Sequence, residues 1–227
     1  SAMQQPLCWI TNAFDRSPAE LLWVPEKAWG PLGGSLINLS YGYGKIFVVP
    51  FEYNEGNERA PVQGGMVELP VTQFPTGLIR GRFKEDDGAL YTCGMFAWAG
   101  SVTQPGGLYR VRYTGKPPHL PKELHARQGR LVLTFTDPID PESVAKLDNF
   151  EFKTWALQRT ANYGSKHIDE KAAPIQKAEL SADGKTLTLS IRDLAPTWCY
   201  SLSYTLRGAD GSPFAGLLHG TVHQLHP

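Results

Sequence analysis

The sequence predicts an all-β protein built from two β-domains in series, and three observations lead to this expectation. Glycine and proline are abundant, with 23 and 18 of 227 residues, and long helices tolerate neither. Apolar and polar residues alternate in short runs, and turn sequences rich in Gly, Pro and Asp separate these runs. A cluster of prolines near the middle of the chain divides the pattern in two.

Composition limits the classes of partner. The chain carries 22 basic and 22 acidic residues and has a pI near 7.0. Nucleic acids and anionic membranes both favour a basic protein face, so we expect neither as a main partner. No apolar run approaches the ~20 residues that a membrane-spanning helix needs, so no membrane span is expected.

The first predicted domain covers residues 4–116, because Ser1-Ala2-Met3 is typical of the remnant of a cleaved expression tag. Its sequence pattern is a series of short strands separated by glycine-containing turns. Asn54–Pro61 is polar and is expected to be a loop, and Asp86-Asp87-Gly88 predicts a tight turn. Strands are expected at Leu36–Leu39, Lys45–Phe51, Gly65–Pro70, Gly77–Phe83, Ala89–Gly94 and Gly107–Tyr113.

A proline-rich connector marks the domain boundary. Pro117, Pro118 and Pro121 lie within a few residues of one another, and such a run is stiff and extended. We therefore expect the second domain at residues 120–227.

The second domain has the pattern of a β-sandwich, with about seven short strands at close spacing. Asp140 is expected to cap a single helical turn that has Pro141 at its first position. Thr160–Pro174 is polar and is expected to be a long insertion. Strands are expected at Arg130–Phe135, Phe150–Trp155, Gln176–Leu180, Thr186–Ile191, Cys199–Leu206 and Gly220–Gln224.

Four short segments of this second domain, in order, resemble the bacterial Ig-like domains of secreted and surface proteins. They are Leu133–Asp140, Leu180–Leu189, Leu194–Pro196 and Ala209–Pro213. The resemblance implies an Ig-like β-sandwich and a secreted or periplasmic location. It is informative about fold and carries no chemistry.

The first domain is similar to the last blades of a sugar-dehydrogenase-like, PQQ-type β-propeller. The similarity lies in Trp29–Leu36, Gly64–Val67, Gly77–Gly94 and Gly107–Val111. A closed propeller needs at least four blades of roughly 40–50 residues, and about 115 residues are too few. We therefore expect a propeller-blade-like domain that closes as a small sandwich or barrel.

The order of the two domains resembles the C-terminal region of large secreted planctomycete and verrucomicrobial proteins. This resemblance implies a redox or carbohydrate context, with carbohydrate or other domains of the parent protein as partners. It places PQQ or haem in a longer parent protein and no cofactor in this chain. The main hypothesis is a non-catalytic module, either ligand-binding or structural. The alternatives are part of a quinone-dependent sugar dehydrogenase and a carbohydrate-binding module.

Arginines flank a glycine in the strand predicted at Gly77–Phe83. Arg80 and Arg82 are two residues apart, so their side chains share one face of the strand. In the sugar dehydrogenases an arginine in a similar strand helps to hold the quinone. The alternative is a solvated face with ion pairs to Glu85 or Asp86.

Aromatic residues are the other candidates for a binding surface. Rings suit sugars because an apolar CH face can stack on a π surface. The alternative for each is packing in the core or between domains. A platform could include Trp29, Tyr41, Tyr43 and Trp98, and a second group in and near the insertion includes Trp155 and Tyr163 with Asn162 and His167.

Metal and catalytic motifs are weak. His219 and His223 are four residues apart, which suits a metal on a helix, but the segment reads as a strand, where that spacing is too wide for one ion. Cys8, Cys93 and Cys199 form no CxxC motif, allow at most one disulfide and are interpreted as small buried apolar residues. No Ser-His-Asp order, GxSxG or P-loop sequence occurs.

Overall fold

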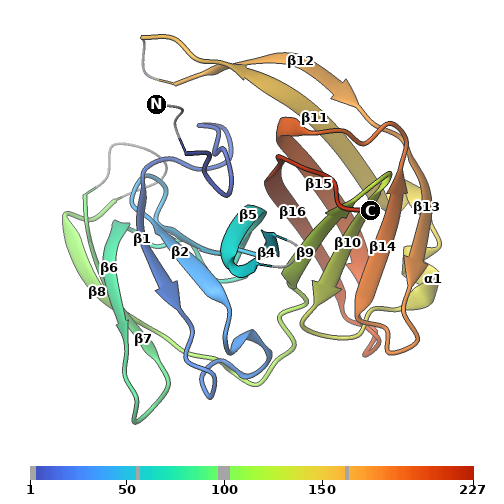
Figure 1. Cartoon of the computed structure of the whole chain (residues 1–227). Helices are drawn as coiled ribbons and strands as arrows, with labels where there is room; N and C mark the ends of the chain where they lie inside the picture. The colour runs from blue at the N-terminus through green and yellow to red at the C-terminus, as the bar shows by residue number, and fades with distance from the viewer. Residues whose placement is uncertain (1–3, 55–56, 97–102, 162–163) are drawn as a thin grey trace. The chain divides into compact units, whose positions relative to one another are not determined.

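The computed structural model describes the chain except for residues 1–3, 55–56, 97–102 and 162–163, and of residues 57–61 it describes only the backbone. It confirms the all-β class (Figure 1). Among the described residues, the strand ladders whose registers are defined are antiparallel. In the described part of the chain no helix is long and apolar enough to cross a membrane.

The chain divides into two compact units that are not consecutive in sequence. Unit 1 combines residues 1–10, 50–67 and 119–227, and unit 2 combines residues 11–49 and 68–118. The sequence placed one domain at 4–116 and the next at 120–227. One boundary between the two units lies next to the proline connector, between Pro118 and His119. Residues 50–67, however, belong to the same unit as the C-terminal strands.

Unit 1 contains two open antiparallel sheets (Figure 1). One has the order β5-β16-β15-β11-β12, with β4 paired to β5, and the other has the order β13-β14-β10-β9. The first sheet and β4 comprise β4 (Phe51–Asn54), β5 (Asn57–Glu68, in unit 1 as far as Val67), β11 (Phe150–Gln158), β12 (Lys166–Ala172), β15 (Thr197–Arg207) and β16 (Pro213–Val222). The second comprises β9 (Pro121–Arg127), β10 (Arg130–Phe135), β13 (Ile175–Leu180) and β14 (Thr186–Ile191).

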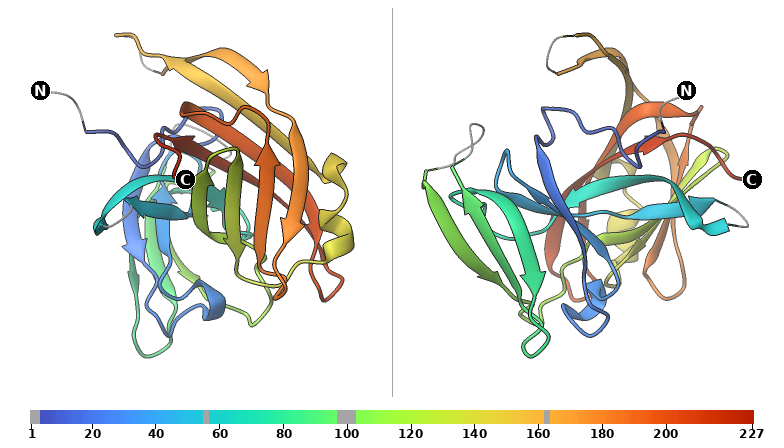
Figure 2. Two further views of the ribbon diagram at one scale, coloured as in Figure 1. Left: turned by 45° about the vertical axis from the view of Figure 1, so that its right-hand side comes forward. Right: turned by 60° about the vertical axis from the view of Figure 1, so that its left-hand side comes forward.

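The two sheets of unit 1 form layers that face one another, as the views of Figures 1 and 2 show. Strand alternation produces the core between them, because every second residue points to the same face. In β10 and β14 the buried residues alternate with partly exposed ones. The largest buried side chains of this core include Leu124, Leu131, Leu133, Phe135, Phe152, Leu187, Leu189, Tyr200 and Leu202.

In unit 1, the observed hairpin turn and helix cap agree with the expectations from the sequence. β13 and β14 form a hairpin across Ala182–Lys185, where Gly184 has a φ of 74°, a left-handed conformation that favours glycine. Asp140 caps the single helical turn α1 (Pro141–Val144) by accepting a hydrogen bond from the Glu142 backbone N–H at 3.1 Å. A 3₁₀ turn, η2 (Leu147–Asn149), then leads into β11.

Unit 2 is also sandwich-like. β1 (Pro18–Trp23), β2 (Leu36–Ser40) and β3 (Lys45–Val48) are paired in that order. β6 (Gly77–Phe83), β7 (Leu90–Met95) and β8 (Gly106–Val111) form a separate open sheet. β6 packs on β1 and β2, and no sheet closes on itself over the described residues. Of the two expected forms, sandwich or barrel, the described strands form the sandwich.

Gly81 shows why the two layers of unit 2 can approach closely. A Cβ atom at this position would lie 2.9 Å from Cδ1 of Leu90 and 3.2 Å from Cδ1 of both Leu22 and Leu39. Only glycine leaves room for the leucine side chains here. The neighbouring residues of β6, Arg80 and Arg82, therefore project from the opposite face of the strand.

Several expectations were wrong. The segment 54–61 was expected to be a loop, but β4 includes Asn54 and β5 begins at Asn57. The polar insertion at 160–174 contains β12, which pairs with β11. No strand was expected at Pro18–Trp23, which forms β1 and pairs with β2.

Candidate functional site

The aromatic residues expected to form a sugar platform in unit 2 are largely used in packing. Trp29 precedes a 3₁₀ turn, η1 (Gly30–Leu32), is buried and meets Phe83 edge-on with ring centroids 5.1 Å apart. The half-buried Tyr41 donates its hydroxyl to the carbonyl of Phe96 at 2.8 Å. Tyr43, also half-buried, donates to the carbonyl of Asn12 at 3.0 Å. Trp98 and Tyr163 lie outside the described residues.

The two arginines of β6 share one face, as the spacing predicts, and their acidic partner is Glu20 of β1. Nη1 of Arg82 lies 2.8 Å from the Glu20 carboxylate, and Nε of Arg80 lies 3.9 Å from it. The same carboxylate accepts a hydrogen bond from the backbone N–H of Gly81 at 2.7 Å. The arginine side chains are 60% and 73% exposed, so these ion pairs contribute little stability.

In unit 1, Trp155 is part of a small buried cluster on the face of β11 that points away from the main core. It lies opposite Cys199 of β15, and Leu157 and the partly buried Trp9 pack against the same cluster. The Trp155 ring stacks on His167 with centroids 4.8 Å apart. Trp155 is therefore a packing residue in this structure and not an open stacking surface.

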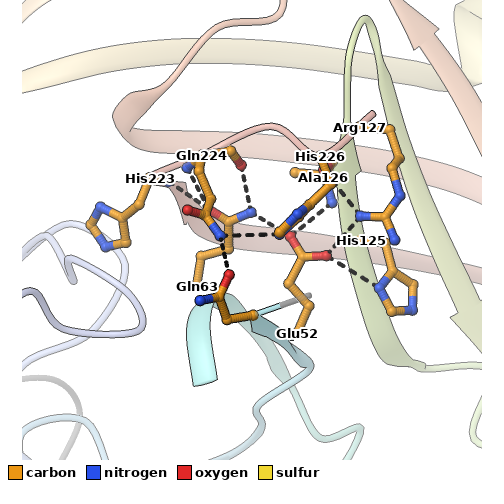
Figure 3. Close-up of polar contacts among 9 residues, drawn as sticks. Glu52, Gln63, His125, Ala126, Arg127, His223, Gln224 and His226 are labelled. Carbon is orange, nitrogen blue, oxygen red and sulfur yellow. Dashed lines mark hydrogen bonds and ion pairs between the residues drawn. The ribbon is translucent and has the colours of Figure 1, made fainter. Parts of the chain in front are cut away.

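A buried carboxylate from β4 forms the centre of the polar cluster drawn in Figure 3. The side chain of Glu52 is only 1% exposed. One of its oxygens accepts hydrogen bonds from the backbone N–H of Ala126, at 3.1 Å, and from the amide of Gln63. The other lies 3.2 Å from Nδ1 of His125 and 3.1 Å from Nη1 of Arg127. All of its donors come from β5 and β9.

Burial opposes ionisation of Glu52, but hydrogen bonds from His125, Gln63 and Ala126 outweigh it. The pKa of Glu52 is therefore lowered from its usual value. A carboxylate whose oxygens already accept four hydrogen bonds is a poor general base, because its lone pairs are engaged. Glu52 acts as a clamp that joins β4 and β5 to β9.

Gln63 extends this cluster to the end of the chain. Its side-chain oxygen accepts hydrogen bonds from the backbone N–H groups of His223, at 2.6 Å, and Gln224, at 2.9 Å. Its amide donates to the carbonyl of Gln224 at 2.8 Å. The amide of Gln224 in turn lies 3.1 Å from Nε2 of His226 (Figure 3). The cluster is thus a continuous network that fixes the segment after β16.

The two histidines four residues apart have a structural role in holding the N-terminal segment Pro6–Trp9. Nε2 of His219 lies 2.8 Å from the carbonyl of Trp9, and Nε2 of His223 lies 2.8 Å from the carbonyl of Pro6. Burial is the main reason that the pKa of His219 falls to about 4. Among the described residues no group of three or more His, Cys, Asp or Glu could hold a metal ion.

The N-terminal segment contributes to an exposed aromatic surface of unit 1, which we call the Trp9–Trp198 surface. The two indoles lie with ring centroids 5.1 Å apart and planes tilted by 30°. Trp198 is 38% exposed, and the Arg159 guanidinium carbon lies 5.3 Å from a Trp9 ring centre. A hollow of about 300 Å³ is lined by Gln5, Trp9, Pro196, Thr197, Trp198, Val222 and His223.

A second hollow, of about 250 Å³, shares Pro196 and Thr197 with the first. Its rim carries exposed charges of both signs, Asp169 and Lys171 from β12 and Arg192 from the segment after β14. The first hollow contains two indoles, and the second combines an apolar lining with charged residues at its rim, so the two offer stacking and hydrogen-bonding groups.

Sequence reasoning missed Trp9, Trp198 and Glu52. Trp198 is the second residue of β15, and the next residues, Cys199 and Tyr200, are fully buried; its place near the strand start after Pro196 was the available signal. Trp9 and Glu52 have no local signal, because Thr221, which binds Trp9, and β9, which binds Glu52, lie more than seventy residues away in sequence.

In comparisons with protein-family models, curated proteins and solved structures, this chain matches none.

Proposed function

We propose that this chain is a non-catalytic module of a secreted protein, and that it binds carbohydrate at the Trp9–Trp198 surface. The observation that carries the proposal is the pair of neighbouring indoles, one of them 38% exposed, in a hollow of about 300 Å³. This volume lies at the lower end of the range for small-molecule pockets, which is roughly 300–1,000 Å³.

The chemistry of the hollow suits a sugar. An exposed indole offers a flat apolar surface of low conformational entropy for the CH face of a pyranose ring. Around it, Gln5, Thr197 and His223 supply groups that can exchange hydrogen bonds with hydroxyls. A mixture of aromatic floor and polar rim favours a neutral, hydroxyl-rich ligand over a purely apolar one.

The direct test is a binding measurement on the whole chain. A glycan array should identify ligands, and titration calorimetry should give their dissociation constants. We expect Trp198→Ala to weaken binding about tenfold, which corresponds to about 1.4 kcal/mol of lost stacking. Trp23→Ala is the matched control, because it removes another exposed indole, 56% exposed, from β1 of unit 2.

Two results would contradict this function. Absence of binding to every glycan tested, or equal weakening by Trp198→Ala and Trp23→Ala, would remove the carbohydrate proposal. Reduction of an artificial acceptor by the purified chain with a sugar and added PQQ would instead support the quinone-dependent dehydrogenase and show that the module is not non-catalytic.

A further inference from the structure

We propose that Cys8 and Cys199 form a disulfide bond in an oxidising environment, and that this bond fastens the N-terminal segment Pro6–Trp9 to β15. The proposal concerns a covalent cross-link and does not depend on what the Trp9–Trp198 surface binds. It rests on the placement of the two sulfur atoms, on the aromatic pair beside them and on the way in which the segment is held.

Both sulfur atoms approach the same carbonyl oxygen. Sγ of Cys8 lies 3.8 Å from the oxygen of Trp9, and Sγ of Cys199 lies 3.4 Å from it. Two atoms at these distances from a common point are separated by no more than the sum of the distances, about 7.2 Å. Rotation about the χ1 bonds, with a small shift of the segment, can bring such a pair to the ~2.05 Å of a disulfide bond.

The residues next to the cysteines are already in register. Trp9 follows Cys8 and Trp198 precedes Cys199, and these two indoles are the tilted pair with centroids 5.1 Å apart. The two backbones therefore run close together at this point. A disulfide would cross-link them directly beside the aromatic contact, where little rearrangement is needed.

Apart from the side-chain contacts of Trp9, the hydrogen bonds that hold the N-terminal segment mostly involve its backbone. Thr221 accepts from the N–H of Trp9 at 2.8 Å, and the N–H of Gly64 donates to the carbonyl of Leu7 at 2.8 Å. His219 and His223 donate to the carbonyls of Trp9 and Pro6. A segment without strand structure, held in this way, gains most from a covalent link.

Neither thiol is suited to another role. Burial raises the pKa of Cys199 to about 12, and burial together with the neighbouring Cys199 raises the pKa of Cys8 further. Such thiols are weak nucleophiles while the segment is docked. We therefore expect the bond to form during folding, before the segment is fully docked, and to resist reduction afterwards.

The oxidant is a low-molecular-weight disulfide such as oxidised glutathione. The thiolate of one cysteine attacks it, forming a mixed disulfide and releasing one glutathione thiolate. The second cysteine then attacks the mixed disulfide and releases the other glutathione. One S–S bond breaks and one forms, the two protein thiols lose two electrons and two protons, and the oxidant gains both. Cys93, exposed on β7 of unit 2, keeps its thiol.

The test is to refold the full chain in a glutathione redox buffer and to map the non-reduced tryptic peptides by mass spectrometry. The three cysteines fall in different tryptic peptides, ending at Arg16, Arg110 and Arg207. We expect a peptide pair joining Cys8 and Cys199, and a single reactive thiol per chain instead of three. Cys93→Ser should leave this pair intact and abolish the remaining thiol, whereas Cys8→Ser should leave two reactive thiols.

The thiol count and the peptide map of the unsubstituted chain do not require a variant to fold. Retention of three reactive thiols after refolding in the redox buffer would overturn the proposal. A link between Cys93 and either of the other cysteines, within or between chains, would overturn it as well.

Discussion

Replacing Glu52 by alanine should cost unit 1 a large part of its stability, because the carboxylate is buried and holds four donors. The backbone N–H of Ala126 and the amide of Gln63 would lose their acceptor in a dry environment, at about 1–3 kcal/mol each. Arg127 and His125, with side chains 28% and 41% exposed, can turn toward water and add less. The expected loss is therefore about 3–5 kcal/mol, as for other buried ionic groups that lose one partner.

The assay is urea-induced unfolding at pH 7, followed by tryptophan fluorescence, since Trp9, Trp155 and Trp198 all belong to unit 1. Glu151→Ala is the control, because Glu151 of β11 forms a solvent-exposed ion pair with Lys153 at 2.9 Å, and its loss should cost less than about 1 kcal/mol. A Glu52→Ala chain that unfolds no more easily than the Glu151→Ala chain would refute the clamp.

The same cluster predicts a pH dependence. The pKa of Glu52 is lowered in the folded protein, so the unfolded chain takes up this proton at a higher pH than the folded chain does. The contribution of ionised Glu52 to the free energy of unfolding is present in full above the ordinary pKa of 4.5, and it is lost as the pH falls through the folded-state pKa. The difference in unfolding free energy between the unsubstituted chain and Glu52→Ala should therefore narrow under acid conditions.

Three further predictions concern other sites. Burial raises the pKa of Asp15 from 3.8 to about 6, so the unfolded chain loses this proton first and stability falls as the pH rises between these values. Asp15→Asn removes the carboxylate that is costly to ionise. Urea unfolding should therefore show that the substituted chain gains unfolding free energy over the unsubstituted chain above pH 4, and that the gain approaches roughly 3 kcal/mol above pH 6. A difference that does not depend on pH would refute this prediction. Gly81→Val should destabilise unit 2 by roughly 1–3 kcal/mol in thermal unfolding, because its side chain meets Leu22, Leu39 and Leu90; an unchanged Tm would show that the layers can separate freely. Asp140→Ala should cost about 1 kcal/mol through loss of the cap on α1, and Asp140→Asn should restore most of it in the same assay.

The sequence predicted best those elements whose signal is local. The β13–β14 hairpin follows from alternating residues on either side of Asp183-Gly184, and α1 follows from Asp140 and Pro141, because each of these features is determined by a few neighbouring residues. The strands that it missed carry no such pattern. Every residue of β12 is exposed, so nothing alternates, and the strand exists because β11 offers it a free edge.

The candidate sites were harder to predict, for the same physical reason. Arg80 and Arg82 do share a face, but their partner Glu20 lies some sixty residues earlier, and only the packing of β6 on β1 brings it close. Trp198 lies near the start of β15, at the register shift between Thr197 and Tyr200, and its neighbour Trp9 comes from the opposite end of the sequence. Contacts between segments so distant along the chain leave no trace in spacing or composition.

The non-consecutive composition of the two units has a consequence for synthesis on the ribosome. All residues of unit 2 have left the ribosome once residue 118 has emerged, so this unit can complete its sheets early. Unit 1 cannot, because its N-terminal segment binds to His219 and His223, and β5 pairs with β16. Until β16 emerges, the segment Pro6–Trp9 lacks His219 and His223, and β5 lacks its partner strand β16, so both segments are available to molecular chaperones.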